Sequence, residues 1–126
     1  EQLQGNNSNI IIMGDFNDDP NSESIKTIME TGRFINPMKK LLSPISGSAN
    51  YRGKWSLFDQ ILLSHSFLNY EAGTHSFVKA KIFSPRFLKE WKGRYKGNPF
   101  RTFAGGRYLG GYSDHFPVYI VLDENK

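Results

Sequence analysis

Three polar clusters in the chain carry side chains that could bind a cation and a phosphate. They are Gly14–Asp18, Phe58–Gln60 and Ser113–His115, and each lies beside or within a run of apolar residues. A carboxylate in such surroundings is costly unless a cation, a hydrogen-bond donor or a metal compensates its charge. The clusters therefore mark the positions at which the sequence could perform chemistry.

The first cluster places two oxygen ligands close together. Asp15 follows the apolar run 10–13 almost directly, and Asn17 lies two residues later. If the chain stays extended, the two side chains point to the same side, where their oxygens suit a hard cation and a phosphate. The alternative is an Asx-type turn in which both residues only hydrogen-bond to the backbone. Taken alone, this cluster favours the turn.

The second cluster contains Asp59, which has apolar neighbours on both sides. It could belong to a buried ion pair or accept backbone N–H groups. It could also hold a histidine, because a carboxylate fixes the tautomer of an imidazole and stabilises its cation during proton transfer. His115 is the candidate partner, since it alone among the three histidines adjoins an acid and precedes an apolar strand. Packing is the alternative for His115, and His65 and His75 are expected at the surface.

Apolar periodicity predicts the elements that position these clusters. The patterns indicate strands, a helix capped by Asn21 or Ser22 and ended by Gly32, a tight hairpin, and one long irregular loop. The strands are expected at 10–13, 57–63, 74–83 and 116–122, the helix at 22–31, the hairpin at 51–55 and the loop at 97–112. The run 10–13 is continuous and β-branched, which is typical of a strand buried on both faces. A mixed α/β domain is the result.

Composition limits the class of protein. A length of 126 residues, with 38% hydrophobic and 14% aromatic residues, suits a single folded domain with a substantial core. The absence of cysteine excludes disulfides, thiolate metal sites and a cysteine nucleophile. The longest apolar runs fall far short of the roughly 20 residues that a membrane-spanning helix needs. The compartment is left open by the sequence.

Positive charge is concentrated in one segment. Residues 79–107 contain nine basic residues and a single acid, Glu90. Such a block favours an anionic partner, such as nucleic acid, phospholipid headgroups or a phosphorylated small molecule. A solvated face that aids solubility explains it equally well.

The same segment contains candidates for substrate contacts. Arg101 and Arg107 could bind substrate phosphates, and the rings of Phe100, Phe103 and Tyr108 could stack on a base or a sugar. A loop that packs its own aromatic residues is the slightly favoured alternative. The two tryptophans, at positions 55 and 91, are expected to serve in packing.

The three clusters together resemble the endonuclease/exonuclease/phosphatase superfamily. Gly14-Asp15-Phe16-Asn17-Asp18, the strand residue Asp59, and Ser113-Asp114-His115 followed by Phe116-Pro117-Val118 occur in the order and approximate spacing of that superfamily. The resemblance covers nearly the whole chain. It implies an α/β fold in which residues 1–126 form the C-terminal half of a four-layer α/β/β/α sandwich. That half would contain one mixed, mainly antiparallel sheet with helices on one face.

The resemblance also implies a role for each site residue. Asp15 and Asn17 would position and polarise the attacking water and the scissile phosphate, and Asp59 would orient His115. His115 would contact or protonate the phosphoryl group, and Asp114 would help to hold a divalent metal, Mg²⁺ or Mn²⁺. The substrate would be a phosphodiester or phosphomonoester, such as nucleic acid, a phospholipid headgroup or a sugar phosphate.

Part of the family's pattern has no counterpart in this chain. The pattern also requires an asparagine, a metal-binding glutamate and a second histidine, all upstream of the strand that leads into Asp15. We therefore expect a half-built site with weak metal affinity and negligible hydrolysis by this chain alone. A free half would leave one sheet face bare, so we expect self-association. The alternative function is a non-catalytic module that binds nucleic acid or an anionic membrane through segment 79–107.

Overall fold

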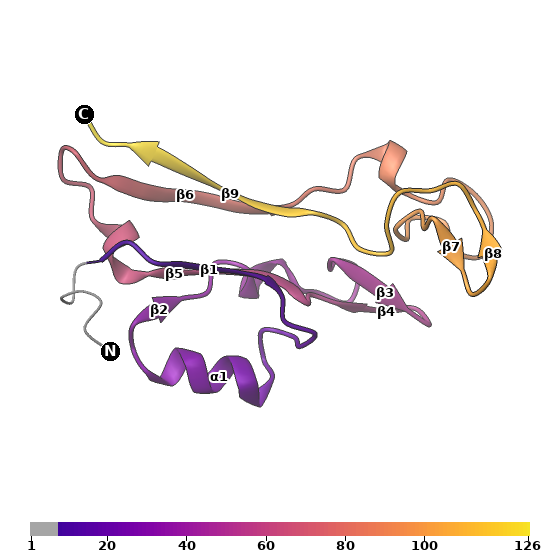
Figure 1. Cartoon of the computed structure of the whole chain (residues 1–126), viewed down its shortest axis with the longest axis horizontal. Helices are drawn as coiled ribbons and strands as arrows, with labels where there is room; N and C mark the ends of the chain where they lie inside the picture. The colour runs from indigo at the N-terminus through magenta and orange to yellow at the C-terminus, as the bar shows by residue number, and fades with distance from the viewer. Residues whose placement is uncertain (1–7) are drawn as a thin grey trace.

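The strands and helices form an elongated molecule (Figure 1). The computed structural model describes residues 8–126; residues 1–7, which the domain prediction also includes, lie outside the described part. The strands are β1 (Ile11–Asp15), β2 (Phe34–Ile35), β3 (Ala49–Tyr51), β4 (Lys54–Ser56), β5 (Asp59–Ser64), β6 (His75–Ile82), β7 (Phe103–Ala104), β8 (Arg107–Tyr108) and β9 (Val118–Glu124). The helices are α1 (Glu23–Glu30) and the short 3-10 segments η1 (Lys39–Leu41), η2 (His65–Leu68) and η3 (Arg86–Leu88).

The predicted elements are confirmed in type and approximate position. The four predicted strands correspond to β1, β5, β6 and β9, and the predicted helix corresponds to α1. Ser22 is the N-cap in an extended conformation, and Gly32 follows the C-cap with a φ of +67°. A positive φ is costly for residues with a Cβ, so glycine at this position ends the helix.

The hairpin of β3 and β4 also forms as predicted. Its two turn residues, Arg52 and Gly53, have φ values of +51° and +83°. Two successive positive φ values define the type I′ turn, whose twist matches that of the flanking strands. The side chain of Asn50 fixes the turn, because its Oδ1 accepts the Gly53 N–H at 3.1 Å.

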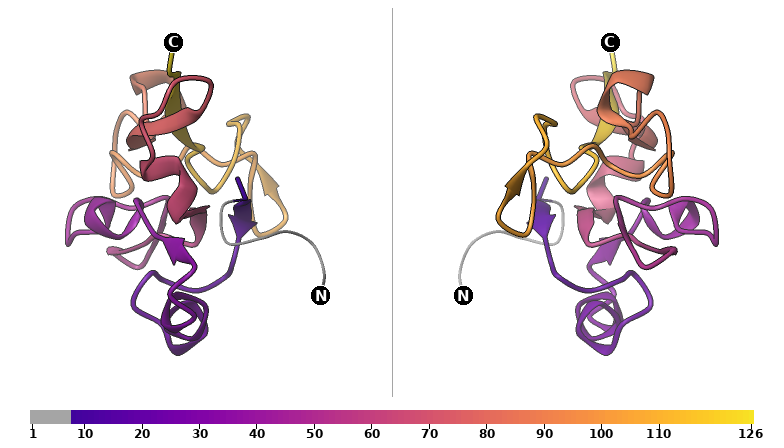
Figure 2. Two further views of the ribbon diagram at one scale, coloured as in Figure 1. Left: turned by 90° about the vertical axis from the view of Figure 1, so that its left-hand side faces the viewer. Right: turned by 90° about the vertical axis from the view of Figure 1, so that its right-hand side faces the viewer.

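The core lies between two antiparallel sheets that pack face to face. Strand β5 lies between β1 and β2 in one sheet, and β6 pairs with β9 in another. Ile61 and Leu63 of β5 belong to a buried cluster with Met38, and the β6–β9 residues Phe77 and Ile120 pack against it. Helix α1 lies on the opposite side of the β1-β5-β2 sheet (Figures 1 and 2). The result is a layered arrangement in which β5 is covered on both faces.

The prediction of one mixed sheet with several helices on one face is wrong in detail. Every strand pairing among the described residues is antiparallel, and the pairings are divided among four sheets. Within residues 8–126, α1 is the single α-helix. The apolar face of β5 packs against the apolar face of the β6–β9 pair. Strands that pack face to face in this way lie in separate sheets and do not pair edge to edge.

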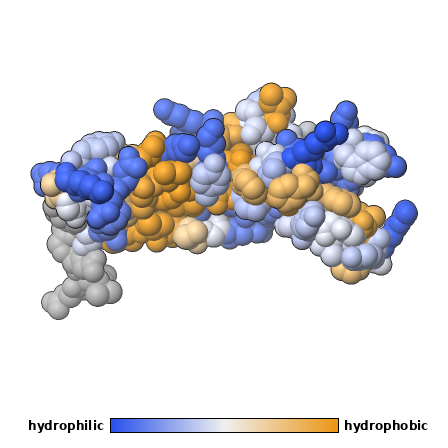
Figure 3. All heavy atoms as spheres, turned by 90° about the horizontal axis from the view of Figure 1, so that it is seen from above, coloured by the Kyte–Doolittle hydropathy of each residue, from blue (hydrophilic) through white to orange (hydrophobic). Residues whose placement is uncertain are grey.

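Strand β1 is not buried on both faces, contrary to prediction. It is an edge strand, with Ile11 41% and Met13 68% exposed. These two residues are opposite Leu63 and Ile61 and therefore share their face of the sheet. The β6–β9 sheet is only two strands wide and covers β5 without covering β1. Figure 3 shows apolar side chains gathered where these four strands lie.

This arrangement corrects the expectation of a bare sheet face. The face of β5 is covered by β6 and β9, so the exposed apolar side chains on this face of the sheet are those of Ile11 and Met13 in β1. Self-association stays a prediction.

The segment 97–112 is more regular than the predicted loop. It contains the small hairpin of β7 and β8, whose strands are joined by Gly105 and Gly106. Residue Lys89 also bridges to Pro99, which ties the start of the segment to the chain before it. Among the described residues, no helix has the length and apolar character needed to cross a membrane.

Candidate functional site

Two of the three predicted acids, Asp15 and Asp59, meet His115 where β1 ends, β5 begins and the chain enters β9. Asp15 is the last residue of β1 and lies opposite Asp59, the first residue of β5. The Nδ1 atom of His115 lies 2.8 Å from Asp59 Oδ2 and 4.0 Å from Asp15 Oδ2. The side chains of Asp59 and His115 are 22% and 26% exposed, whereas that of Asp15 is 50% exposed. The site is therefore half-buried at the pair and open at Asp15.

The hydrogen bond determines the tautomer of the histidine. A carboxylate oxygen accepts hydrogen bonds, so His115 Nδ1–H donates this hydrogen bond to Asp59 Oδ2. The second ring nitrogen, Nε2, is then the atom left to exchange a proton or contact a ligand. The predicted pairing of these two side chains is thus present, while their catalytic roles stay predictions.

A buried serine holds this pair from one side. Ser48 is fully buried, and its carbonyl oxygen accepts the Phe116 N–H at 2.7 Å. Its hydroxyl oxygen accepts the Asp59 N–H at 3.4 Å. Ser48 therefore touches β5 next to the acid and the final segment next to the histidine.

The position of Ser48 depends on the glycine before it. A Cβ atom at Gly47 would lie 2.4 Å from the backbone oxygen of Ser56. Real Cβ atoms do not approach that closely, so only glycine permits the Ser48 N–H to reach Ser56 O at 2.8 Å. The stacked rings of Trp55 and Phe116, 6.0 Å apart, join the same segments.

A second set of contacts holds the loop that follows Asp15. The Phe16 N–H donates to Phe58 O at 2.8 Å, and Asp19 Oδ1 accepts the Leu57 N–H at 2.7 Å. The fully buried Gln60 donates from Nε2 to the carbonyl of Asp18 at 2.7 Å. Its Oε1 in turn accepts the side-chain amide of Asn36 at 2.9 Å. The first two polar clusters of the sequence are thus tied together.

Asp15 and Asn17 adopt the Asx-type turn that their cluster favoured. The Asn17 N–H donates to Asp15 Oδ1 at 2.8 Å, and Asn17 has a φ of +53°. The chain is therefore not extended here, and the condition for both side chains to share one side is not met. The turn does not exclude Asp15 from the site, because its Oδ2 lies toward His115.

The remaining predicted residues lie outside the close cluster. Asp114 is exposed and does not belong to the group formed by Asp15, Asp59 and His115. Arg101 is half-buried in the loop before β7, and Arg107 is exposed in β8. Their roles in binding metal and substrate stay predictions.

The close cluster could hold a metal ion. One ligand atom from each of Asp15, Asp59 and His115 lies within 4.8 Å of the other two. Hard divalent cations prefer oxygen ligands, which the two carboxylates provide. Because His115 Nδ1–H donates a hydrogen bond to Asp59, the carboxylates fit a hard cation better than this nitrogen does.

One pair of aromatic residues packs within the long loop, while Tyr112 packs on Phe87 outside it. Phe103 and Tyr108 meet edge to face at 5.4 Å, although both are more than half exposed. Trp55 packs on Phe116 as expected. Trp91 is instead 63% exposed, with Lys92 Nζ 4.3 Å from its ring centre, so the packing prediction is wrong there.

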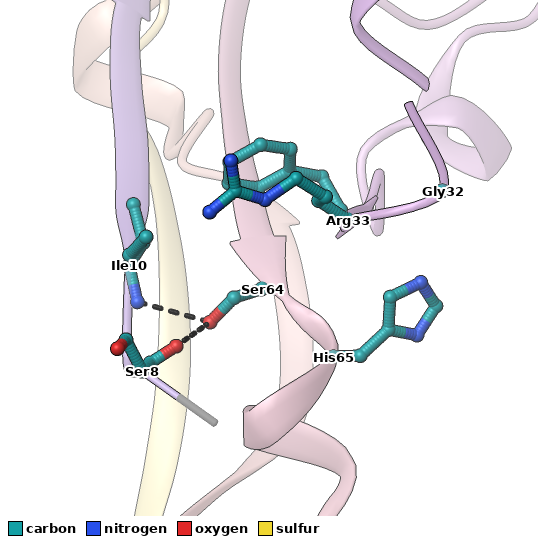
Figure 4. A pocket seen from close by; sticks show the side chains of 7 residues that line it. Ser8, Ile10, Gly32, Arg33, Ser64 and His65 are labelled. Atoms are coloured by element: carbon teal, nitrogen blue, oxygen red, sulfur yellow. Dashed lines mark hydrogen bonds between the residues drawn. The ribbon is translucent and has the colours of Figure 1, made fainter. Parts of the chain in front are cut away.

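A cavity of about 490 Å³ lies at the end of β5 that is opposite Asp59. Figure 4 shows Arg33 extending toward β1 there, and Ser64 Oγ accepting the Ile10 N–H at 2.9 Å. Ser64 ends β5 whereas Asp59 begins it. This cavity is therefore separate from the carboxylates of Asp15 and Asp59.

Three supporting residues were not predicted from sequence. Gln60 stands in the same apolar run as Asp59, so its buried amide could have been recognised by the same argument. Gly47 and Ser48 carry no signal in their spacing, because their importance arises from contacts with distant segments.

The fold agrees with that of a solved structure. The chain superposes along 95% of its length on the mannosyl-6-phosphatase Bt3783 of Bacteroides thetaiotaomicron VPI-5482, with a TM-score of 0.55 and 20% identity. It spans 39% of that structure. No curated protein sequence gave a significant match. The family model described as Endonuclease/Exonuclease/phosphatase family matches residues 2–124, and the chain therefore belongs to this family.

Proposed function

We propose that this chain supplies the C-terminal half of a divalent-metal-dependent phosphoester hydrolase. The observation that carries the proposal is the 2.8 Å hydrogen bond between His115 and Asp59, with Asp15 4.0 Å from the same ring nitrogen. Family membership supports phosphoester hydrolysis in general. An acid, a carboxylate-bound imidazole and a partly open rim are the groups that such a reaction needs.

The proposed roles follow from the chemistry of each side chain. His115 would hold a proton at Nε2 for the phosphoryl group or leaving oxygen, and Asp59 would stabilise the imidazolium form. Asp15 and Asn17 would orient the attacking water. Mg²⁺ or Mn²⁺, held by Asp114 together with the glutamate that the family pattern places upstream, would neutralise phosphate charge when bound.

The substrate class is proposed in an order for testing. The matched structure is named a mannosyl-6-phosphatase, and this chain spans 39% of its length. We place sugar phosphates first, and phosphodiesters of nucleic acid or phospholipid headgroups second. Kinetics on p-nitrophenyl phosphate, bis-p-nitrophenyl phosphate and a hexose 6-phosphate would separate a phosphatase from a phosphodiesterase.

The decisive experiment uses a protein that joins this chain to the N-terminal half implied by the family. His115→Gln should lower kcat by about 10²–10⁴-fold, the usual contribution of a positioned acid or base. His65→Gln is the matched control, because His65 is exposed at the far end of β5. EDTA should abolish turnover and Mg²⁺ should restore it. Equal rates for the two histidine variants would overturn the proposal.

The chain by itself should hydrolyse these substrates negligibly and bind metal weakly. The cluster offers two carboxylates and one imidazole, and the imidazole nitrogen nearest to them is already hydrogen-bonded. Robust turnover by the purified 126-residue chain, sensitive to His115→Gln, would contradict the proposed division of the site.

A binding module without catalysis is the second candidate. Within residues 8–126, no salt bridge involves a basic residue of segment 79–107, so these cations are available to an anionic partner. A module would bind an oligonucleotide or anionic vesicles with steep salt dependence. It would lose that affinity when Arg94, Lys96 and Arg101 become alanine, and it would keep it in His115→Gln.

A further inference from the structure

A second hollow lies beside Asp15, Asp59 and His115, the proposed catalytic cluster, but none of these three residues lines it. Its volume is about 330 Å³, and we call it the lysine pocket. Its lining residues come from the stretches 45–55 and 82–98 and from Phe116. The pocket is thus a separate site.

The charge of the lysine pocket is unbalanced. Lys89 is half-buried and Lys96 is exposed, and both line the same hollow. No acidic residue is among the lining residues, and within residues 8–126 neither lysine forms a salt bridge. The like charges of two lysines that line one hollow repel each other, so an anion bound between them would relieve that repulsion.

The other lining residues indicate which chemical groups the anion carries. Hydroxyl groups of Ser46 and Ser84 and the amide of Asn98 offer hydrogen bonds to oxygen atoms. Trp55 offers an aromatic surface and is fixed by stacking on the buried Phe116, with 21° between the ring planes. A fixed aromatic wall favours a ligand that carries a ring.

We propose that the lysine pocket binds a phosphate monoester of a sugar. The dianionic phosphate would pair with Lys89 and Lys96, and the sugar ring would lie against Trp55 with its hydroxyls on the serines and Asn98. The proposal concerns a second binding site and does not depend on the hydrolytic activity.

The position of the pocket connects it to the catalytic pair. Gly47 and Phe116 line the pocket, and they directly adjoin Ser48 and His115 in the chain. Ser48 accepts hydrogen bonds from Asp59 and Phe116. A ligand in the pocket therefore contacts the segments that hold the Asp59–His115 pair.

The intrinsic fluorescence of Trp55 tests the proposal directly. Trp91→Phe removes the other tryptophan, which is exposed, and leaves Trp55 as the sole reporter. Titration of this variant of the chain with glucose 6-phosphate should give a saturable change in emission. Inorganic phosphate should bind roughly tenfold more weakly, since it lacks the ring, and glucose should give no saturable change. Equal affinity for glucose and glucose 6-phosphate would overturn the proposal.

A matched pair of double variants tests the lysines. In the Trp91→Phe background, Lys89→Gln with Lys96→Gln should weaken glucose 6-phosphate binding by about tenfold or more, because two charge-assisted contacts are lost. Lys79→Gln with Lys81→Gln changes the net charge equally on the exposed surface of β6 and should leave binding unchanged. An equal loss of glucose 6-phosphate affinity in both double variants would contradict the proposal, because binding would then depend on net charge and not on the lysine pocket.

One further variant separates the lysine pocket from the catalytic cluster. His115→Gln should retain the Trp55 response, because His115 does not line the pocket. Loss of the response in His115→Gln, together with its retention in the pocket double variant, would assign the bound phosphate to the catalytic cluster instead.

Discussion

Two regions of this chain contrast in how they hold their side chains. Asp15, Asp59 and Gln60 lie on or beside paired strands, and their neighbours are tied by hydrogen bonds across long stretches of sequence. The segment 86–112 holds its shape mainly through turns and short backbone bridges, such as Phe100 N–H to Leu88 O at 2.8 Å. Its aromatic and basic side chains are largely exposed.

The contrast indicates which region should tolerate change. Buried strand residues lose packing or hydrogen bonds when altered, whereas exposed loop residues lose little. The predictions below probe this difference by the free energy of unfolding of the chain, measured by urea denaturation.

The largest expected effect is in the buried core around β5. Leu63→Ala should lower the free energy of unfolding by about 2–5 kcal/mol, because it opens a cavity at a fully buried position. Leu68→Ala is the matched control, since Leu68 is 44% exposed. Similar losses for the two leucines would show that the β5 core is not packed as described.

The next effect concerns the close approach of Gly47 to Ser56, next to the Asp59–His115 pair. Gly47→Ala should cost about 1–3 kcal/mol, because the new methyl group would collide with Ser56 O and displace the backbone. Gly106→Ala adds the same methyl group in open space and should be nearly neutral. If Gly47→Ala were as stable as Gly106→Ala, the tight packing of Ser48 against β4 would be refuted.

A smaller cost is expected for the buried amide beside Asp59. Gln60→Ala should destabilise by about 1–2 kcal/mol, because Asp18 O and the Asn36 amide both lose a partner. In a double-mutant cycle, Asn36→Ala should cost clearly less in the Gln60→Ala background than alone. Strict additivity would mean that the two side chains do not interact.

The smallest effect is expected in the exposed hairpin. Tyr108→Ala should change the free energy of unfolding by no more than about 0.5 kcal/mol, because Tyr108 is 68% exposed and its main ring contact, Phe103, is also exposed. A loss comparable to that of Leu63→Ala would remove the distinction between the two regions.

The sequence predicted the strand region well for a physical reason. A charge within an apolar run is costly without compensation, and this predicts a partner for Asp59, for which His115 is the candidate. Alternating and continuous apolar patterns located β5, β6, β9 and α1. Local patterns cannot distinguish an edge strand from a central one, so the exposure of Ile11 and Met13 was missed.

The supporting contacts were beyond such reasoning. Gly47 and Ser48 matter because of where Ser56, Asp59 and Phe116 lie in space, and nothing in their spacing reveals this. Trp91 was assigned to packing on residue type alone, yet its environment is solvent and Lys92. Tertiary contacts therefore determined what the sequence could not predict.

The dual contact made by Ser48 has a consequence for motion. Because this one residue accepts the amides of both Asp59 and Phe116, local opening of the loop around it would release the acid and the imidazole in the same event. The two amides should therefore exchange their hydrogens with solvent at similar rates, as members of a single cooperative unit.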